Sequence, residues 1–349
     1  MEFWSRLEKA PWGLSLDDVL LIPQYSDVKI DEIEVSTRLT RRLILNIPII
    51  SSPMDTVTGE AMALRLAELG GLGVLPRNME LTQTLSVIKK AREEKLPISI
   101  AVGPFDEDRV KACIEAGAEL IVVDSAHGHS RNVIEATKKF KEYGVEVMAG
   151  NVVTREGAYA LIDAGADVLR VGLGSGHACT TREVAGVGVP QLTAISWVAD
   201  VARETGVGVV ADGGIEKPAH VVKALAAGAD AVMLGYLLAG TDETPGEIIE
   251  IDGKKYKPYR GMGSKGALAA GSSRYGTFKR VPEGVEGYVE YRGSVANVVE
   301  VLVNALKQGM GYIGAKNLNE LREKAVFVKI TSMGLQESSP RGMVVTRWL

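Results

Sequence analysis

The chain has 349 residues, 46% of them hydrophobic and 24% charged, with a formal net charge of −4. This composition is ordinary for a globular protein and argues against nucleic-acid binding through bulk positive charge, while no apolar run approaches the ~20 residues that a membrane span requires. The first residues have no apolar signal-peptide core, and two cysteines are too few for a disulfide framework or a structural zinc site, so we expect an intracellular, cytoplasmic enzyme with neither a nucleic-acid nor a membrane partner.

Short apolar runs alternate with helical patterns from residue 46 onward. The apolar runs occupy residues 46–52, 72–76, 98–103, 120–125, 145–151, 168–174, 207–214 and 231–236. Runs this short and continuous are typical of parallel strands that are buried on both faces. Several of the segments between them end in Ala-Gly-Ala, where the glycine can terminate a helix. Eight strands alternating with helices predict an α/β fold of the (β/α)8 TIM-barrel class over about residues 46–240.

The segments after the barrel have a different composition. Residues 245–292 are rich in Gly, Lys, Tyr and Pro and are too long for an ordinary loop, which predicts a mobile flap after strand eight. An amphipathic helix and a polar tail are expected over residues 293–349. No second core is evident, so the pattern indicates a single catalytic domain with appendages.

Polar residues and glycines gather where the predicted strands end, which is the rim that carries the active sites of barrel enzymes. Gly213 and Gly214 follow strand seven and Gly235 follows strand eight, where barrels often bind phosphate; relief of crowding in tight turns explains the same glycines equally well. Asp124 and Asp212 end strands four and seven. They could hydrogen-bond a ribose or carboxamide, or cap the next helices.

The stretch GLGSGHACTTR, residues 172–182, contains one of the two cysteines. Cys179 lies just beyond strand six among glycines and polar residues, which suits a reactive thiol, whereas Cys113 falls on the apolar stripe of a helix and is expected in the core. His127 and His129 are a weak metal pattern without a third ligand. We expect His220 to be an ordinary helix residue.

Eight motifs together resemble the IMP dehydrogenase/GMP reductase family. In chain order they are DDVLLIP (17–23), SSPMDTVT (51–58), DSAHGHS (124–130), GNVVT (150–154), CTTREVAGVGVPQLTA (179–194), ADGGI (211–215), YRGMGS (259–264) and VPEGVEG (281–287). The resemblance runs from about residue 14 to residue 340, and the fold it implies is the barrel. Many IMP dehydrogenases insert two CBS domains after strand two. Only residues 77–97 lie there in this chain, so we expect no CBS domains.

The resemblance implies NAD-dependent oxidation of IMP to XMP. Cys179 would be the nucleophile that attacks purine C2, giving a covalent thioimidate once hydride has left. The pair Arg274 and Tyr275 would activate the water that hydrolyses this adduct, and Thr181 would face the base.

The resemblance also assigns binding residues. The nucleotide would contact Ser52, Met54, Asp212, Gly213, Gly214, Gly235, Tyr259, Met262, Gly263 and Glu283. The nicotinamide side would meet Asp124, Ser125, Ala126 and Asn151. A potassium ion would bind the carbonyls of Gly174, Gly176 and Cys179, with Glu337, Ser338 and Ser339 contributed by a neighbouring subunit. Sharing of this kind implies a homotetramer.

Two positions depart from the family pattern at the phosphate. His177 and Tyr236 stand where the family has phosphate-contacting serines. Either ring can still donate to a phosphate and would then be part of the substrate site, but both are larger than serine. The phosphate would shift, or the substrate would be a modified nucleotide or lack the phosphate.

Two other activities compete with IMP oxidation. A GMP reductase would use the same cysteine with NADPH and release ammonia, with Thr181 and Glu283 serving the leaving amine. An idle paralogue that only binds purine nucleotides would explain His177 and Tyr236. Arg274 and Tyr275 favour the dehydrogenase.

Overall fold

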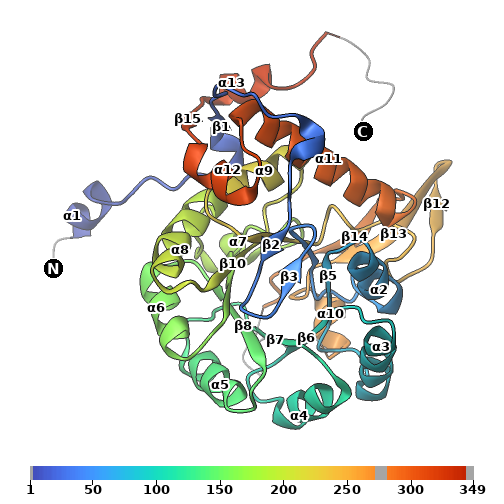
Figure 1. Cartoon of the computed structure of the whole chain (residues 1–349). Helices are drawn as coiled ribbons and strands as arrows, with labels where there is room; N and C mark the ends of the chain where they lie inside the picture. The colour runs from blue at the N-terminus through green and yellow to red at the C-terminus, as the bar shows by residue number, and fades with distance from the viewer. Residues whose placement is uncertain (1–2, 272–280, 343–349) are drawn as a thin grey trace.

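Eight parallel strands form a closed barrel in the computed structural model, which describes residues 3–271 and 281–342 (Figure 1). The barrel strands are β4 (Ile49–Ser51), β5 (Leu72–Leu75), β6 (Ile98–Val102), β7 (Leu120–Asp124), β8 (Glu146–Val152), β9 (Val168–Val171), β10 (Gly208–Asp212) and β11 (Ala231–Leu234). Pairing of β11 with β4 closes the ring. Seven strands lie within their predicted runs and β8 ends one residue beyond its run, so the predicted TIM barrel is confirmed.

Helices surround the barrel on the outside (Figure 1). They are α2 (Glu60–Glu68), α3 (Leu81–Glu93), α4 (Glu107–Ala116), α5 (Arg131–Lys141), α6 (Arg155–Asp163), α8 (Gln191–Thr205), α9 (Pro218–Ala226) and α11 (Val295–Ile313), with a short α7 (Thr181–Ala185) after β9. Local sequence sets their ends. The Thr154 side chain accepts the Gly157 N–H at the start of α6, and Gly117 ends α4 in the left-handed region at φ 113°.

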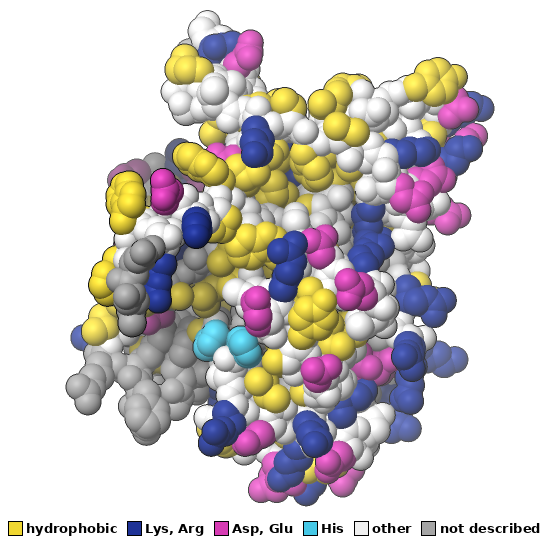
Figure 2. All heavy atoms as spheres, turned by 90° about the vertical axis from the view of Figure 1, so that its left-hand side faces the viewer, with side chains coloured by type: hydrophobic (Ala, Val, Ile, Leu, Met, Phe, Trp, Pro, Cys, Tyr) yellow, Lys and Arg dark blue, Asp and Glu magenta, His cyan; other side chains and the backbone are white. Residues whose placement is uncertain are grey.

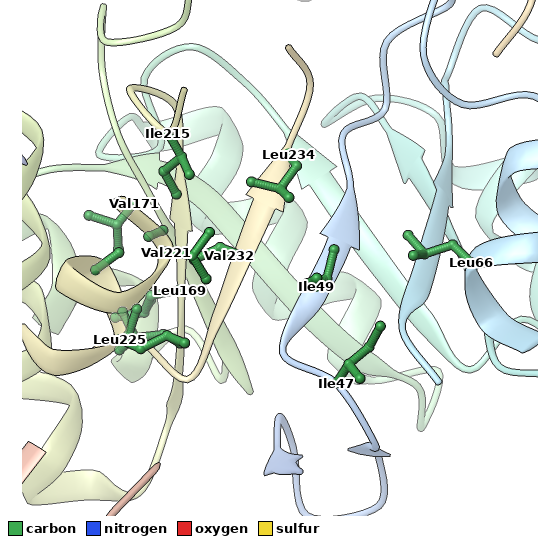
Figure 3. Close-up of a cluster of buried hydrophobic side chains, with 14 of the residues drawn as sticks. Ile47, Ile49, Leu66, Leu169, Val171, Ile215, Val221, Leu225, Val232 and Leu234 are labelled. Atoms are coloured by element: carbon green, nitrogen blue, oxygen red, sulfur yellow. The ribbon is translucent and has the colours of Figure 1, made fainter. Parts of the chain in front are cut away.

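Two apolar cores explain why the strand sequences are continuously hydrophobic. Ile49 packs in the layer between barrel and helices, and its neighbour Ile50 packs inside the barrel. Figure 3 shows part of the outer layer, with Val232 and Leu234 of β11 near Val221 of α9. Because side chains alternate along a strand, burial on both faces requires apolar residues at every position.

The N-terminal segment closes one end of the barrel. Strands β2 (Thr37–Arg38) and β3 (Ile44–Leu45) form a hairpin that lies across the barrel's centre in the view of Figure 1. Leu39, Leu43 and Leu45 join the interior core. The hairpin meets the N-terminal ends of the strands, since a Cβ on Gly208 would lie 2.2 Å from the Leu39 carbonyl oxygen.

Two segments from near opposite ends of the chain pair beside the barrel. Strand β1 (Val19–Leu21), which follows the short helix η1 (Leu16–Asp18), pairs with β15 (Phe327–Lys329). The remaining elements here are η2 (Ile30–Glu32), α12 (Leu318–Lys324), α13 (Ser332–Glu337) and α1 (Phe3–Glu8), which projects away from the body in Figure 1. No helix within residues 3–271 and 281–342 combines the length and apolar character of a membrane span. Acidic and basic side chains are interspersed on the face shown in Figure 2.

Part of the predicted flap region forms an antiparallel sheet. Strands β12 (Ile249–Ile251), β13 (Lys254–Arg260) and β14 (Glu286–Glu290) pair in that order, and α10 (Lys265–Ala269) follows β13. The sequence pattern predicted only a long flap, because two of these strands are largely exposed and carry little apolar signal. Residues 272–280 of the flap lie outside the described part.

Lys257 anchors this sheet to the barrel. Its buried ammonium donates to the carbonyls of Thr241 (3.0 Å), Asp242 (3.3 Å) and Thr244 (2.5 Å), in the segment after β11, and burial lowers its pKa. We predict that Lys257→Met lowers the free energy of unfolding by about 1–3 kcal/mol, because buried carbonyls lose their donor. Urea unfolding measures this. Lys254→Met, on the exposed part of the same strand, is the control; an equal loss in both variants would contradict the anchoring role.

Candidate active site

A pocket opens at the C-terminal ends of the barrel strands, where the sequence predicted the site. Fifteen of the predicted site residues line it together: Ser52, Met54, Ala126, Asn151, Gly174, Gly176, His177, Cys179, Thr181, Asp212, Gly213, Tyr259, Met262, Gly263 and Glu283. They come from the loops after β4, β7, β9 and β10, from α7, from strands β8, β10 and β13, and from residues 262–263 and 283. The barrel therefore gathers at one rim residues that are far apart in the sequence.

Cys179 begins a chain of hydrogen bonds in this pocket. Its thiol donates to Thr181 Oγ1 (3.2 Å), and that hydroxyl donates to Glu283 Oε2 (2.8 Å). Thr181 is buried, whereas Cys179 is half-buried and faces the pocket. The arrangement joins a candidate nucleophile to a carboxylate through one hydroxyl.

Backbone contacts hold Glu283 beside the cysteine loop. The Val285 N–H donates to the Ala178 carbonyl (3.0 Å), and the Glu283 N–H donates to the Gly263 carbonyl (3.0 Å). Cys179 and Gly284 form an isolated antiparallel bridge. The loop after β9 is thus attached to the segment preceding β14, although about a hundred residues separate them in the chain.

Sequence reasoning missed Arg170, which crosses the floor of the site. Its Nη1 lies 2.5 Å from Asp124 Oδ1 and its Nε lies 2.9 Å from Asp212 Oδ2, and only 1% of its side chain is exposed. Asn151 Nδ2 donates to the same Asp212 oxygen (2.8 Å). The sequence did contain a signal for Arg170, which stands inside the apolar run VLRVG. A charge inside a buried apolar strand must be paired, so partners for this arginine could have been expected. Asp124 is used to hold Arg170 and does not line the pocket.

The glycines at the pocket rim are required by close backbone approach. A Cβ on Gly172 would lie 1.9 Å from the Asp212 carbonyl oxygen, and one on Gly213 would lie 2.6 Å from Ser175 Oγ. Gly213 and Gly214 also have left-handed φ values of 95° and 72°. Relief of crowding, left open by the sequence, is therefore part of their role.

Three aromatic rings stand at one end of the pocket: His177, Tyr236 and Tyr259. Burial raises the pKa of the Tyr259 hydroxyl, which keeps it a neutral donor at physiological pH. Tyr236, Gly214 and Gly235, all predicted to bind the substrate, do not line the pocket.

The structure also places the second cysteine and the three other histidines that the sequence raised as weaker candidates. Burial in α4 raises the pKa of the Cys113 thiol to about 11, as expected of a core cysteine. The rings of His127 and His129 lie 6.3 Å apart near the rim. His220 is more than an ordinary helix residue, because its buried ring contacts Asp17 (2.9 Å) and the Gly214 carbonyl (3.1 Å).

A family model described as the IMP dehydrogenase / GMP reductase domain matches residues 13–341. The chain belongs to this family. The inosine-5'-monophosphate dehydrogenase of Aquifex aeolicus is 40% identical, with 97% of each chain covered, and that of Methanocaldococcus jannaschii is 39% identical, with 99% of this chain and 98% of the relative covered. The enzyme of the same name from Cryptosporidium parvum is 42% identical, with 93% and 94% covered.

The expected lack of CBS domains stays a prediction. The comparison with the Aquifex enzyme spans 477 positions, whereas this chain has 349 residues. That member of the IMP dehydrogenase/GMP reductase family therefore carries residues that have no counterpart here.

The pocket lining does not include four other residues that the family resemblance predicted: Ser125, Glu337, Ser338 and Ser339. The Ser125 hydroxyl is 3.4 Å from the His127 carbonyl oxygen, and the Gly176 carbonyl accepts the Cys179 N–H (3.0 Å). Glu337 ends α13, which contacts η1, and Ser338 and Ser339 follow it. Arg274 and Tyr275 fall in 272–280, outside the described residues, and their roles stay predictions.

Proposed function

We propose that the chain oxidises IMP to XMP with NAD, a step toward guanine nucleotides. The observation that carries this proposal is the hydrogen-bonded series Cys179–Thr181–Glu283 inside a barrel-rim pocket. Relatives that are 39–42% identical over nearly the whole chain are named inosine-5'-monophosphate dehydrogenase, which supports the same substrate here.

Cys179 would act as the nucleophile toward purine C2. A thiolate attacks, so the thiol must lose its proton. Thr181 and Glu283 offer a path for that proton, because each donor already points at the next acceptor. The sulfur–C2 bond then turns a difficult substitution at an aromatic carbon into two easier steps.

The cofactor would lie against Ala126 and Asn151, which line the same pocket as Cys179. Bound NAD supplies the acceptor for the hydride that leaves C2. The Asn151 amide is held by the Gly172 carbonyl (2.8 Å) and by Asp212, which fixes its orientation toward the pocket. Asp124 would act through Arg170, with which it pairs, and Ser125 would meet the cofactor at the edge of the site.

A monovalent cation would fit the carbonyl-rich loop that carries Gly174, Gly176 and Cys179, since carbonyl oxygens are suitable ligands for such ions. Completion by Glu337, Ser338 and Ser339 of a neighbouring subunit belongs to the same proposal, as do a homotetramer and a cytoplasmic location. Arg274 and Tyr275 would activate water for release of XMP.

One assay separates this function from GMP reduction. The purified chain is expected to reduce NAD when given IMP and to form XMP, followed by cofactor absorbance and chromatography of the product. GMP with NADPH is tested in parallel, because Thr181 and Glu283 would serve a leaving amine equally well. Turnover with GMP alone would refute the proposal in favour of the reductase, and absence of turnover with both would favour a nucleotide-binding paralogue.

A further inference from the structure

The end of the pocket at His177 is filled by stacked rings. The centroids of His177 and Tyr236 are 3.8 Å apart with an interplanar angle of 21°, and Tyr259 lies 6.3 Å and 6.2 Å from them. Rings stacked at this distance leave no room for a ligand group between them. His177 lines the pocket and Tyr236 does not, so the imidazole forms the boundary at this end.

Two charged side chains hold the stack in place. The Glu216 carboxylate is hydrogen-bonded to His177 Nδ1 (2.9 Å). The Arg292 guanidinium lies 4.7 Å from the centroid of the Tyr236 ring and donates to the carbonyls of Tyr236 and Leu237 (both 3.1 Å). Because the imidazole covers one face of Tyr236, the guanidinium must cover the other.

This boundary lies where a barrel protein would place a phosphate. Phosphates often bind at the loops after the seventh and eighth strands, here β10 and β11. Of the glycines in those loops, Gly213 lines the pocket, whereas Gly214 and Gly235 do not. The backbone amides that would cradle a phosphate are therefore only partly accessible from the pocket.

The charges at this end also disfavour a phosphate dianion. Arg170 is the single Lys or Arg among the described residues that line the pocket, and both Asp124 and Asp212 pair with it. Nearby Lys217 is paired with Asp17 (3.1 Å), and Arg292 is held behind Tyr236. Glu216 instead brings a negative charge to the boundary, which repels a dianion.

We propose that this end of the pocket accepts an uncharged 5′-hydroxyl, so that the chain oxidises purine nucleosides, inosine to xanthosine, as well as the nucleotide. The hydroxyl would meet the pair formed by His177 and Glu216. This inference rests on the proposed function, because it uses the same chemistry at C2. The Cys179 thiol loses its proton and its sulfur bonds to C2, and hydride then leaves C2 with its electron pair and reduces NAD. Water attacks C2, the C2–sulfur bond breaks and the thiol regains a proton, so that one proton is released to solvent for each nucleoside oxidised.

The experiment measures kcat/KM for inosine and for IMP in the wild type. We expect the two values to lie within about tenfold of each other, whereas a site built around the phosphate would reject the nucleoside by roughly 10⁴-fold. A wild-type preference for IMP of that larger size would overturn the proposal.

Variants test whether the boundary sets this preference. Glu216→Gln keeps a hydrogen-bond acceptor for His177 but removes the charge, and is expected to shift the ratio toward IMP by about tenfold or more. The double variant His177→Ser/Tyr236→Ser is expected to shift it the same way, because the ring stack is removed. Asp200→Asn, which neutralises an exposed carboxylate paired with Arg155, is the charge-matched control.

The outcomes distinguish failure of nucleoside use from failure of the proposed IMP oxidation. Equal ratios of kcat/KM for inosine and IMP in Glu216→Gln and Asp200→Asn would refute the role of Glu216 in setting the preference. A merely structural effect would lower both activities together without changing their ratio. Oxidation of IMP without oxidation of inosine would refute nucleoside use and leave IMP oxidation standing. Oxidation of neither compound would refute the proposed function itself.

Discussion

Cys179→Ala is expected to abolish oxidation of IMP, with a fall in kcat of at least about 10⁴-fold. No other described side chain in the pocket is a thiol, because Cys113 is buried in α4. Without the sulfur, C2 cannot become tetrahedral through a covalent bond to the protein. Stopped reactions followed by intact-protein mass spectrometry would detect the substrate adduct in the wild type and its absence in the variant.

Cys113→Ala is the matched control for this experiment. It removes the other cysteine of the chain, whose thiol is buried and has a raised pKa. The control is expected to retain both turnover and the covalent adduct. An adduct that persists in Cys179→Ala and disappears in Cys113→Ala would show that the nucleophile has been assigned to the wrong residue.

Arg170→Met is expected to lower the free energy of unfolding by about 3–5 kcal/mol, because it leaves buried carboxylates without their cation. Asp124 is 1% exposed and Asp212 is 16% exposed, and both contact the guanidinium. The variant is also expected to lose activity, since Asn151 and Asp212 depend on the same network. Urea unfolding and steady-state kinetics measure the two effects.

A compensated variant separates charge balance from geometry. Combining Arg170→Met with Asp124→Asn and Asp212→Asn removes all three charges, and most of the lost stability is expected to return, as it does when buried ion pairs are replaced as a unit. Activity is not expected to return, because Asp212 itself lines the pocket. A loss below about 1 kcal/mol in Arg170→Met alone would contradict the proposed role of the network.

The pocket joins segments that meet only through the barrel. Thr181 and Glu283 are 102 positions apart, and Arg170 is 46 positions from Asp124. Their contacts depend on strand order and on how the segment before β14 crosses the loop after β9. Substitutions in either segment are therefore expected to change the same site.

Much of the fold could be predicted from the sequence because its signal is local. Continuous apolar runs such as 120–125 and 168–174 reflect strands buried on both faces, and glycines such as Gly117 mark helix ends through their left-handed φ. Cys179 was recognisable as a candidate reactive thiol from its polar, glycine-rich surroundings. The hairpin β2–β3 and the sheet β12–β14 were not predicted, since their strands are short or exposed.

The barrel, the rim that carries the site and the family could all be read from the amino-acid sequence, because strand burial, helix ends and the cysteine motif are encoded by neighbouring residues. Three features became visible only in the folded chain: the partners of Arg170, the attachment of Glu283 to Cys179 through Thr181, and the closing of the pocket by His177, Tyr236 and Glu216. These contacts join residues from different strands and loops. Their distances follow from closure of the barrel, which no local periodicity specifies.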